Sequence, residues 1–246
     1  NKNRKITDYN RWFLMFIGSG VALVTPFKNN GEIDWDKFHD LIRYHVGHKT
    51  DAIIVCGTTG EAPTLSIEEH LKCIEECVKY AKGSIPIIAG TGSNNTSTAI
   101  LNSKEAEKLG ADGLLLVTPY YNKTTQEGLI KHYGMIADSV NIPIILYNVP
   151  SRTGININPS TFGRLFKSYE NIIGIKEASG NINQVAEIMD ATNKQALIYS
   201  GNDSEVIPTL SLGGVGVISV VANIMPDLMH DMVYDYIKGN RFDALN

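Results

Sequence analysis

Eight short apolar runs, separated by stretches with helical periodicity, dominate the pattern of this chain. Each run is almost continuously apolar, which is typical of parallel strands that are covered on both faces. Repeated strand-then-helix units predict an α/β protein, and eight of them predict a (β/α)8 TIM barrel, with a doubly wound open sheet as the alternative. The runs span residues 20–27, 51–61, 84–92, 111–119, 141–150, 171–179, 196–203 and 215–220.

The stretches between the runs carry apolar residues at helical spacing. In residues 33–48, for example, Trp35 and Phe38 fall on the same face of the expected helix. Ser66 precedes the next helical stretch, and Glu69 follows it by three residues, as in a capping box. These signals predict helices that connect the strands.

We divide the chain into three expected parts. Residues 1–14 are interpreted as an extension or an expression remnant, because the first residue is Asn and the segment does not resemble a secretory leader. Residues 15–224 are expected to form the catalytic barrel. Residues 225–246 are expected to begin a C-terminal helical region that is truncated after a helix from Pro226 to about Lys238.

Composition argues against several classes of function. The net charge of −4 does not favour a surface that binds nucleic acid or an anionic membrane, and the apolar runs are too short to span a bilayer. An odd number of cysteines and no signal peptide predict a reducing cytoplasm. Cys73 and Cys77 are four residues apart, which favours a buried helix face over a metal or redox pair, since no further ligand completes a site.

The most informative residue for chemistry is Lys176, which interrupts the apolar run 171–179. The working face of such a barrel lies at the C-terminal ends of its strands, where this chain has hydroxyls and glycines but no histidine, so no metal centre is expected. A lysine in a dry site has a lowered pKa, and its neutral amine can attack a carbonyl to form a Schiff base. The alternative is a structural lysine that reaches water or pairs with Glu177.

Other polar residues at the strand ends have two interpretations each. Tyr147 ends its run and could relay protons, or it could be a core aromatic with a satisfied hydroxyl. Arg152 could bind a carboxylate with its two-pronged guanidinium, or it could be a solvated loop charge. Thr58 and Thr59 lie between glycines, either in an anion-binding loop or simply in a tight turn.

Glycine placement disfavours a phosphorylated substrate. Barrels often bind phosphate with glycine-rich loops after strands seven and eight, but SVVANIMPD after the eighth run has none and SGND after the seventh supplies only Gly201. GTGSNN after the third run has only the first two glycines of a dinucleotide fingerprint. A carboxylate substrate without phosphate is therefore preferred.

The stretch VTPYYN follows an apolar run with two adjacent tyrosines, Tyr120 and Tyr121. If the strand continued through them, their side chains would point to opposite sides.

Seven motifs occur in one order along the chain: GTTGEAPTLS (57–66), IAGTGSNNT (88–96), VTPYYNKTTQEGL (117–129), LYNVPSRTG (146–154), IGIKEASGN (173–181), SGND (200–203) and GVISVVAN (216–223). As a set, these motifs resemble the dihydrodipicolinate synthase (4-hydroxy-tetrahydrodipicolinate synthase) family of the pyruvate-dependent lyases and aldolases. The resemblance covers most of the chain, from about residue 18 onward.

The resemblance implies a Schiff base between Lys176 and pyruvate, with no cofactor and no metal. Thr59 and the backbone near Ile218 would hold the pyruvate carboxylate and the enamine, and Gly201 would belong to the same substrate site. The enamine would attack L-aspartate-4-semialdehyde, and transimination would close the ring to 4-hydroxy-tetrahydrodipicolinate. This is the first committed step of diaminopimelate and lysine biosynthesis.

The resemblance also implies a proton relay. Tyr147 would donate and accept the proton, and Thr58 and Tyr121 would complete the relay. Tyr121 would come from a neighbouring subunit of a homodimer or homotetramer. Arg152 would receive the carboxylate of the aldehyde substrate.

The chain departs from the family in two respects. Lysine-regulated members have a second pocket, to which Tyr120, Asn94 and His70 correspond, but Ala62, Pro63, Ile67 and Thr98 differ from its polar and acidic residues. We therefore expect no feedback inhibition by lysine, which a lysine titration of turnover checks. Most of the family's C-terminal helical domain is also missing, which bears on tetramer assembly.

Two alternatives remain open beside this synthase. One is a sister aldolase of the N-acetylneuraminate lyase or 2-keto-3-deoxy sugar acid type, which shares the barrel, the lysine and the YN-P strand but is less similar around Thr58 and Arg152. The other is a truncated, non-catalytic protein that binds a partner or an oxo acid.

Overall fold

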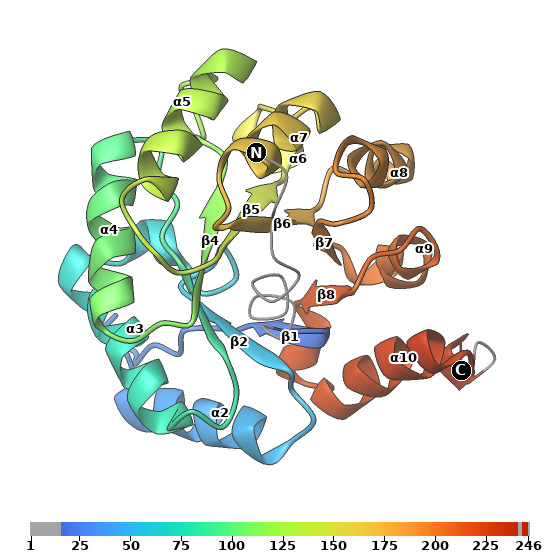
Figure 1. The fold of residues 1–246 in the computed structure, drawn as a ribbon. Coiled ribbons are helices and arrows are strands. Elements are labelled where there is room, and N and C mark those ends of the chain that lie inside the picture. The colour runs from blue at the N-terminus through green and yellow to red at the C-terminus, as the bar shows by residue number, and fades with distance from the viewer. Residues whose placement is uncertain (1–15, 241–242, 246) are drawn as a thin grey trace.

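Eight parallel strands pair in sequence order and close into a barrel in the computed structural model, which describes residues 16–240 and 243–245 (Figure 1). Closure is direct, because β1 pairs in parallel with β8 and Gly20 lies opposite Ile218. An open sheet would instead end in two unpaired edge strands, so the predicted (β/α)8 barrel is confirmed. The strands are β1 (Gly18–Ala22), β2 (Ala52–Val55), β3 (Ile87–Gly90), β4 (Gly113–Val117), β5 (Ile144–Asn148), β6 (Ile172–Glu177), β7 (Leu197–Ser200) and β8 (Gly216–Ser219).

Helices cover the outside of the barrel (Figure 1). The predicted capping box begins α3: the Ser66 hydroxyl accepts a bond from the Glu69 backbone N–H at 3.1 Å, and the Glu69 carboxylate accepts one from the Ser66 N–H at 2.9 Å. The α-helices are α2 (Trp35–Gly47), α3 (Ile67–Ala81), α4 (Thr96–Lys108), α5 (Gln126–Ala137), α6 (Pro150–Thr153), α7 (Pro159–Ser168), α8 (Ile182–Ala191), α9 (Val206–Ser211) and α10 (Pro226–Lys238). Short 3-10 turns are η1 (Ala62–Thr64), η2 (Asp203–Glu205), η3 (Val221–Asn223) and η4 (Asp243–Leu245).

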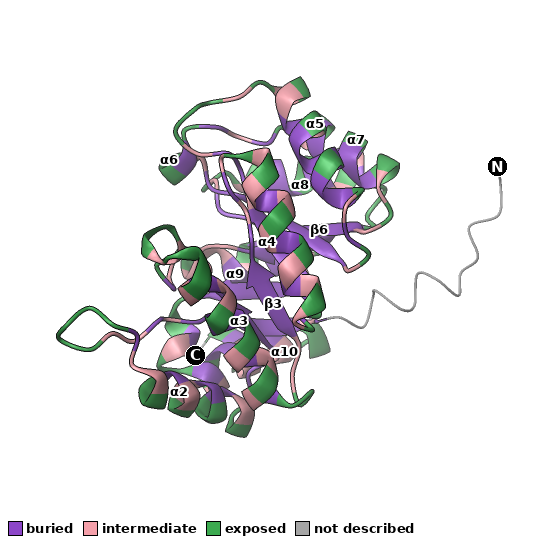
Figure 2. Ribbon diagram, turned by 90° about the vertical axis from the view of Figure 1, so that its left-hand side faces the viewer, coloured by how far each residue is buried: buried purple, intermediate pink, exposed green. Residues whose placement is uncertain are grey.

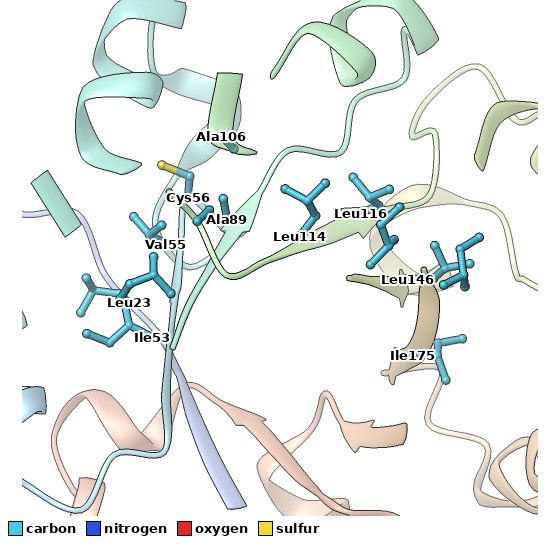
Figure 3. Packing of buried hydrophobic residues seen from close by; sticks show 14 of the residues in the cluster. Leu23, Ile53, Val55, Cys56, Ala89, Ala106, Leu114, Leu116, Leu146 and Ile175 are labelled. Atoms are coloured by element: carbon cyan, nitrogen blue, oxygen red, sulfur yellow. The ribbon is translucent and has the colours of Figure 1, made fainter. Parts of the chain in front are cut away.

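Side chains alternate between two apolar layers along each strand. Leu114 and Leu116 pack outward against the helices (Figure 3), whereas Leu115 belongs to a second cluster that contains no helical residue and therefore fills the barrel interior. Figure 2 shows the consequence, with strands buried along almost their whole length and helices buried mainly along one side. The predicted burial of Cys73 and Cys77 on α3 is confirmed.

A bulge in β6 decides which way Lys176 points. Ile144 pairs with Ile172, but Ile145 pairs with Gly174, so Ile173 is an extra residue in the ladder. The alternation therefore shifts: Ile173 faces the interior, yet Ile175 packs in the outer layer (Figure 3). As a result, the next residue, Lys176, points into the barrel.

The C-terminal helix α10 belongs to the ring around the barrel (Figure 1). Met229 and Val233 of this helix bury their side chains in the outer apolar layer of the barrel. The Tyr234 hydroxyl donates to the Ile17 carbonyl at 3.3 Å. This helix therefore covers the barrel, and its bounds confirm the predicted helix from Pro226 to about Lys238. The expected extension at residues 1–14 lies outside the described residues.

In the part of the chain that the structure describes, no helix combines the length and the apolar character needed to cross a bilayer.

Candidate active site

Lys176 lies at the C-terminal end of β6 and is almost fully buried. Its Nζ sits 4.4 Å from the centroid of the Tyr147 ring, whose Cα is its register partner on β5. Burial lowers the pKa of Lys176 to about 8, the nearby Asp203 carboxylate acts to raise that pKa, and the Arg152 guanidinium acts to lower it. A large fraction of the amine is therefore neutral and nucleophilic near pH 8.

Glu177, the sequence neighbour of Lys176, points to the other side of the strand. Its carboxylate accepts hydrogen bonds from the Asn148 and Gln184 side-chain amides and from the Ser179 backbone N–H. The alternative in which Lys176 pairs with Glu177 is therefore wrong, because that carboxylate is occupied in the outer layer.

Tyr147 combines a buried ring with a hydrogen-bonded hydroxyl at the end of β5. Burial raises the pKa of its phenol, while the Arg152 charge and a hydrogen bond with Thr58 act to lower that pKa. The phenol is thus protonated at neutral pH and already connected to Thr58. The structure brings together two of the three predicted relay residues.

The segment GTTGE forms a tight turn after β2. The Gly60 and Glu61 N–H groups donate to the Gly57 and Thr58 carbonyls at 3.1 and 3.0 Å, and the Thr25 hydroxyl donates to the Gly60 carbonyl at 2.7 Å. A side chain at Gly60 would place its Cβ 2.8 Å from the Leu23 carbonyl oxygen, so the close approach requires glycine. The turn carries Thr58 and Thr59 to the C-terminal end of the barrel.

Arg152 lies in the short helix α6, directly after β5. The Thr153 hydroxyl fixes this helix, because it accepts from the Thr118 hydroxyl at 2.9 Å and donates to the carbonyls of Val149 and Ile155 at 3.2 and 3.1 Å. The Arg152 side chain itself is exposed, and its charge acts on the pKa of both Tyr147 and Lys176. It is thus placed to bind an anion that enters from solvent.

The ends of β7 and β8 complete this face of the barrel. Gly201 donates its N–H to the Glu177 carbonyl at 2.7 Å, and a Cβ at Gly201 would lie 3.2 Å from Lys176 Cε. Glycine at this position therefore leaves room for the lysine stem. Ile218 lies fully buried in the interior cluster of the barrel, four positions before the Ala222 of η3.

Tyr121 stands apart from the other candidate residues. The strand β4 ends at Val117 and does not continue through Tyr120 and Tyr121, so strand alternation does not orient their side chains. Instead, Tyr121 has φ of 75°, and the Asn122 N–H donates to the Tyr120 carbonyl across it at 3.0 Å, which is the pattern of a rare, strained γ-turn. The turn leaves Tyr121 89% exposed and Tyr120 half-buried.

A cavity of about 200 Å³ opens beside this site, toward α3 and α4. Tyr147 and Thr58 form one part of its wall, and the other predicted site residues do not line it. Its remaining wall includes Tyr120, His70, Ala62, Pro63, Ile67 and Thr98. These residues therefore share one cavity with the two relay residues, and insensitivity to lysine stays a prediction.

Within residues 16–240 and 243–245, no group of three or more His, Cys, Asp or Glu side chains is arranged to hold a metal ion.

Asp203 is the residue whose importance the sequence did not reveal. It stands in the short motif SGND at the end of the seventh run, but only the folded chain brings its charge close to Lys176.

Comparisons with known proteins identify relatives in sequence and in structure. The sequence model of the "Dihydrodipicolinate synthetase family" matches residues 15–246. The 4-hydroxy-tetrahydrodipicolinate synthase of Lachnoclostridium phytofermentans is 52% identical over 232 residues, which cover 94% of this chain and 79% of that protein.

Two solved structures are similar throughout the barrel. Dihydrodipicolinate synthase from Aquifex aeolicus superposes with a TM-score of 0.91 at 47% identity. The match covers 93% of this chain and 78% of the Aquifex chain. The chloride-inhibited enzyme from Acinetobacter baumannii, solved in complex with pyruvate, superposes with a TM-score of 0.90 at 46% identity over the same shares of the two chains. The fold, the order of the motifs and these matches together establish that the chain belongs to the dihydrodipicolinate synthetase family.

Proposed function

We propose that this chain condenses pyruvate with L-aspartate-4-semialdehyde to give 4-hydroxy-tetrahydrodipicolinate, through a Schiff base on Lys176. Membership of the family makes the chain a lyase. The observation that carries the proposal is the buried lysine with a pKa of about 8, stacked on Tyr147 at the mouth of the barrel. A similar solved enzyme, from Acinetobacter baumannii, binds pyruvate.

In this proposal the neutral amine of Lys176 attacks the carbonyl carbon of pyruvate, and the ketone oxygen leaves as water with uptake of one proton, which gives a protonated imine. The imine makes the pyruvate methyl group acidic without a metal, and loss of a proton gives the enamine that attacks the aldehyde. Tyr147 moves protons to and from these intermediates, because it lies beside Lys176 and its phenol interacts with Thr58, the next residue of the proposed relay. Transimination by the substrate amine closes the ring and frees Lys176.

The substrate carboxylates are assigned to two places. Thr59, Gly201 and the backbone near Ile218 hold the carboxylate of pyruvate, which keeps its ketone near Lys176. The exposed Arg152 receives the carboxylate of the aldehyde substrate, since a guanidinium binds a carboxylate through two parallel hydrogen bonds.

Trapping the imine tests the proposal. Borohydride together with pyruvate is expected to add one pyruvate-derived mass to the folded protein, and peptide mapping should place it on Lys176. Borohydride alone is the control. No adduct on folded protein would refute the Schiff-base function, and an adduct without turnover of aspartate semialdehyde would favour the non-catalytic alternative.

A substrate panel separates the sister aldolases. Turnover of N-acetylneuraminate or 2-keto-3-deoxy sugar acids in preference to aspartate semialdehyde would favour that alternative. The exposed Arg152 argues against a sister aldolase, because its guanidinium offers a carboxylate-binding group to the entering substrate.

We also propose that Tyr121 completes the relay of a neighbouring subunit in a homodimer or homotetramer. Its exposure of 89% and its strained backbone support this assignment, since strained turns persist where function selects them. We expect Tyr121→Phe to lower turnover at least tenfold, while pyruvate adduct formation partly survives. Steady-state kinetics check this expectation.

The neighbouring substitution Tyr120→Phe is the matched control and should leave turnover nearly unchanged. Wild-type turnover in Tyr121→Phe, or full activity in a protein that sediments as a monomer, would contradict the cross-subunit role.

A cytoplasmic location is part of the same proposal. The three cysteines Cys56, Cys73 and Cys77 are buried free thiols, which suits a reducing compartment. Cell fractionation of the tagged protein checks it, and enrichment outside the cytoplasm would overturn it.

A further inference from the structure

Asp203 connects the ends of β7 and β8. It opens the short turn η2, and its Oδ2 accepts hydrogen bonds from the backbone N–H groups of Val220 and Val221, each at 3.1 Å. Two donors from consecutive residues fix the position of this carboxylate. Its orientation is therefore set by the backbone that follows β8.

The second oxygen of the same carboxylate is buried and unpartnered. Asp203 Oδ1 has no hydrogen-bond donor among the described residues, although buried acceptors are nearly always satisfied. A buried carboxylate oxygen without a partner is stabilised when a positive charge or a hydrogen-bond donor lies beside it. Such a charge arises on Lys176, whose stem packs at Gly201, two residues before Asp203, and whose Cα pairs with Tyr199 on β7.

The other groups around Lys176 do not supply a negative charge. Tyr147 on β5 presents the face of its ring, and Arg152 on α6 adds a positive charge. Tyr199 on β7 donates its hydroxyl to the Phe16 carbonyl at 2.7 Å, and Glu177 is held in the outer layer. Among the described residues, the carboxylate that acts on Lys176 is therefore Asp203.

We propose that Asp203 is a positioning residue that stabilises the positively charged forms of Lys176, first the ammonium and then the protonated imine, through its free Oδ1. The part of this inference that concerns the imine rests on the proposed function, whereas the part that concerns the ammonium does not. Formation of the imine from the neutral amine and a ketone takes up one proton and releases one water, so one positive charge appears next to Asp203. Removal of the carboxylate leaves that charge without its counter-ion.

Asp203→Asn is the decisive variant, because the asparagine oxygen can still accept from Val220 and Val221 while the charge is lost. We expect the pH midpoint of Lys176, measured by NMR of ¹³C-labelled lysine and by the pH dependence of borohydride-trapped adduct, to fall by about one unit. Turnover at pH 8 should fall at least tenfold. Glu205→Gln is the matched control, since this carboxylate belongs to the same turn but accepts from Asn202 instead, at 2.9 Å.

An unchanged midpoint in folded Asp203→Asn, or an equal shift in Glu205→Gln, overturns the inference. If Asp203→Asn does not fold, Asp203→Ser replaces it, because its hydroxyl can accept from the same N–H groups without a charge. A wild-type protein that forms no pyruvate adduct overturns the proposed function instead, and the NMR titration then still decides the role of Asp203 toward the ammonium.

Discussion

Substitution of Lys176 with methionine is expected to abolish turnover and, at pH 7, to make the protein more stable. Loss of activity follows because the imine forms on the amine of Lys176, which methionine lacks. The gain in stability follows from burial: the folded protein lowers the pKa of Lys176 from 10.5 to about 8, so at pH 7 it must hold an ammonium in a dry site. A shift of this size corresponds to about 3 kcal/mol.

The pH dependence of this gain is fixed in sign. Because the folded-state pKa lies below the unfolded one, the folded chain binds fewer protons between about pH 8 and pH 10.5, and stability rises with pH in that window. The penalty is complete below about pH 8 and disappears as the pH approaches 10.5. Methionine fills a similar volume and can contact the Tyr147 ring through its sulfur.

Thermal unfolding at pH 7 and at pH 10 checks the expectation. Lys176→Met should raise Tm by several degrees at pH 7, and the difference should shrink at pH 10. Lys167→Met, at an exposed position of α7, is the matched control and should change Tm little at either pH. A lower Tm for Lys176→Met at pH 7 would mean that the ammonium is well satisfied and that burial does not lower its pKa.

The barrel was predictable because its strands are buried on both faces and leave continuous apolar runs. The first and last residues of the strands were predicted less accurately. The run 20–27 predicted a strand that extends to Phe27, but β1 is Gly18–Ala22. The difference has a physical reason, since the Val24 N–H donates to the Asn223 side-chain oxygen at 3.1 Å instead of to a neighbouring strand, and Pro26 further along has no N–H. Apolar composition therefore identified the strands, while backbone chemistry decided where they end.

The direction of Lys176 could not be predicted from alternation. Strand periodicity counts residues in twos, and the extra residue Ile173 in the β6 ladder reverses the phase before the lysine. Lys176 was nevertheless identified, because a single charge in an apolar run is informative whichever side it faces. Asp203 was missed for the opposite reason, since a carboxylate in a loop is ordinary in sequence and its neighbours come from other strands.

The comparisons confirm the predicted family and the predicted enzyme class, whereas the roles of individual residues remain predictions. The structure supports those roles unequally. Lys176, Tyr147, Thr58 and Arg152 act on one another through contact or charge. Tyr121 faces solvent in the single chain, so its proposed role depends on a second copy.

Replacing Tyr147 with phenylalanine should separate the two functions that this residue combines. The ring stays, so the contact at 4.4 Å with Lys176 Nζ and the packing of the barrel interior persist. Only the hydroxyl and its hydrogen bond with Thr58 are lost, which should cost about 1 kcal/mol of stability. Because every proposed proton transfer passes through this hydroxyl, turnover should fall by roughly 10²–10⁴-fold.

The adduct experiment distinguishes proton transfer from a structural defect. Tyr147→Phe should still form the borohydride-trapped pyruvate adduct on Lys176, because the amine keeps its buried position and its low pKa. Tyr199→Phe is the matched control: it removes a buried hydroxyl that bonds to the Phe16 carbonyl, on the strand beside Lys176, and should keep turnover within a few-fold of wild type. Equal losses of turnover in the two variants would show that these buried hydroxyls matter only for packing. Full turnover in Tyr147→Phe would show that another group transfers the protons.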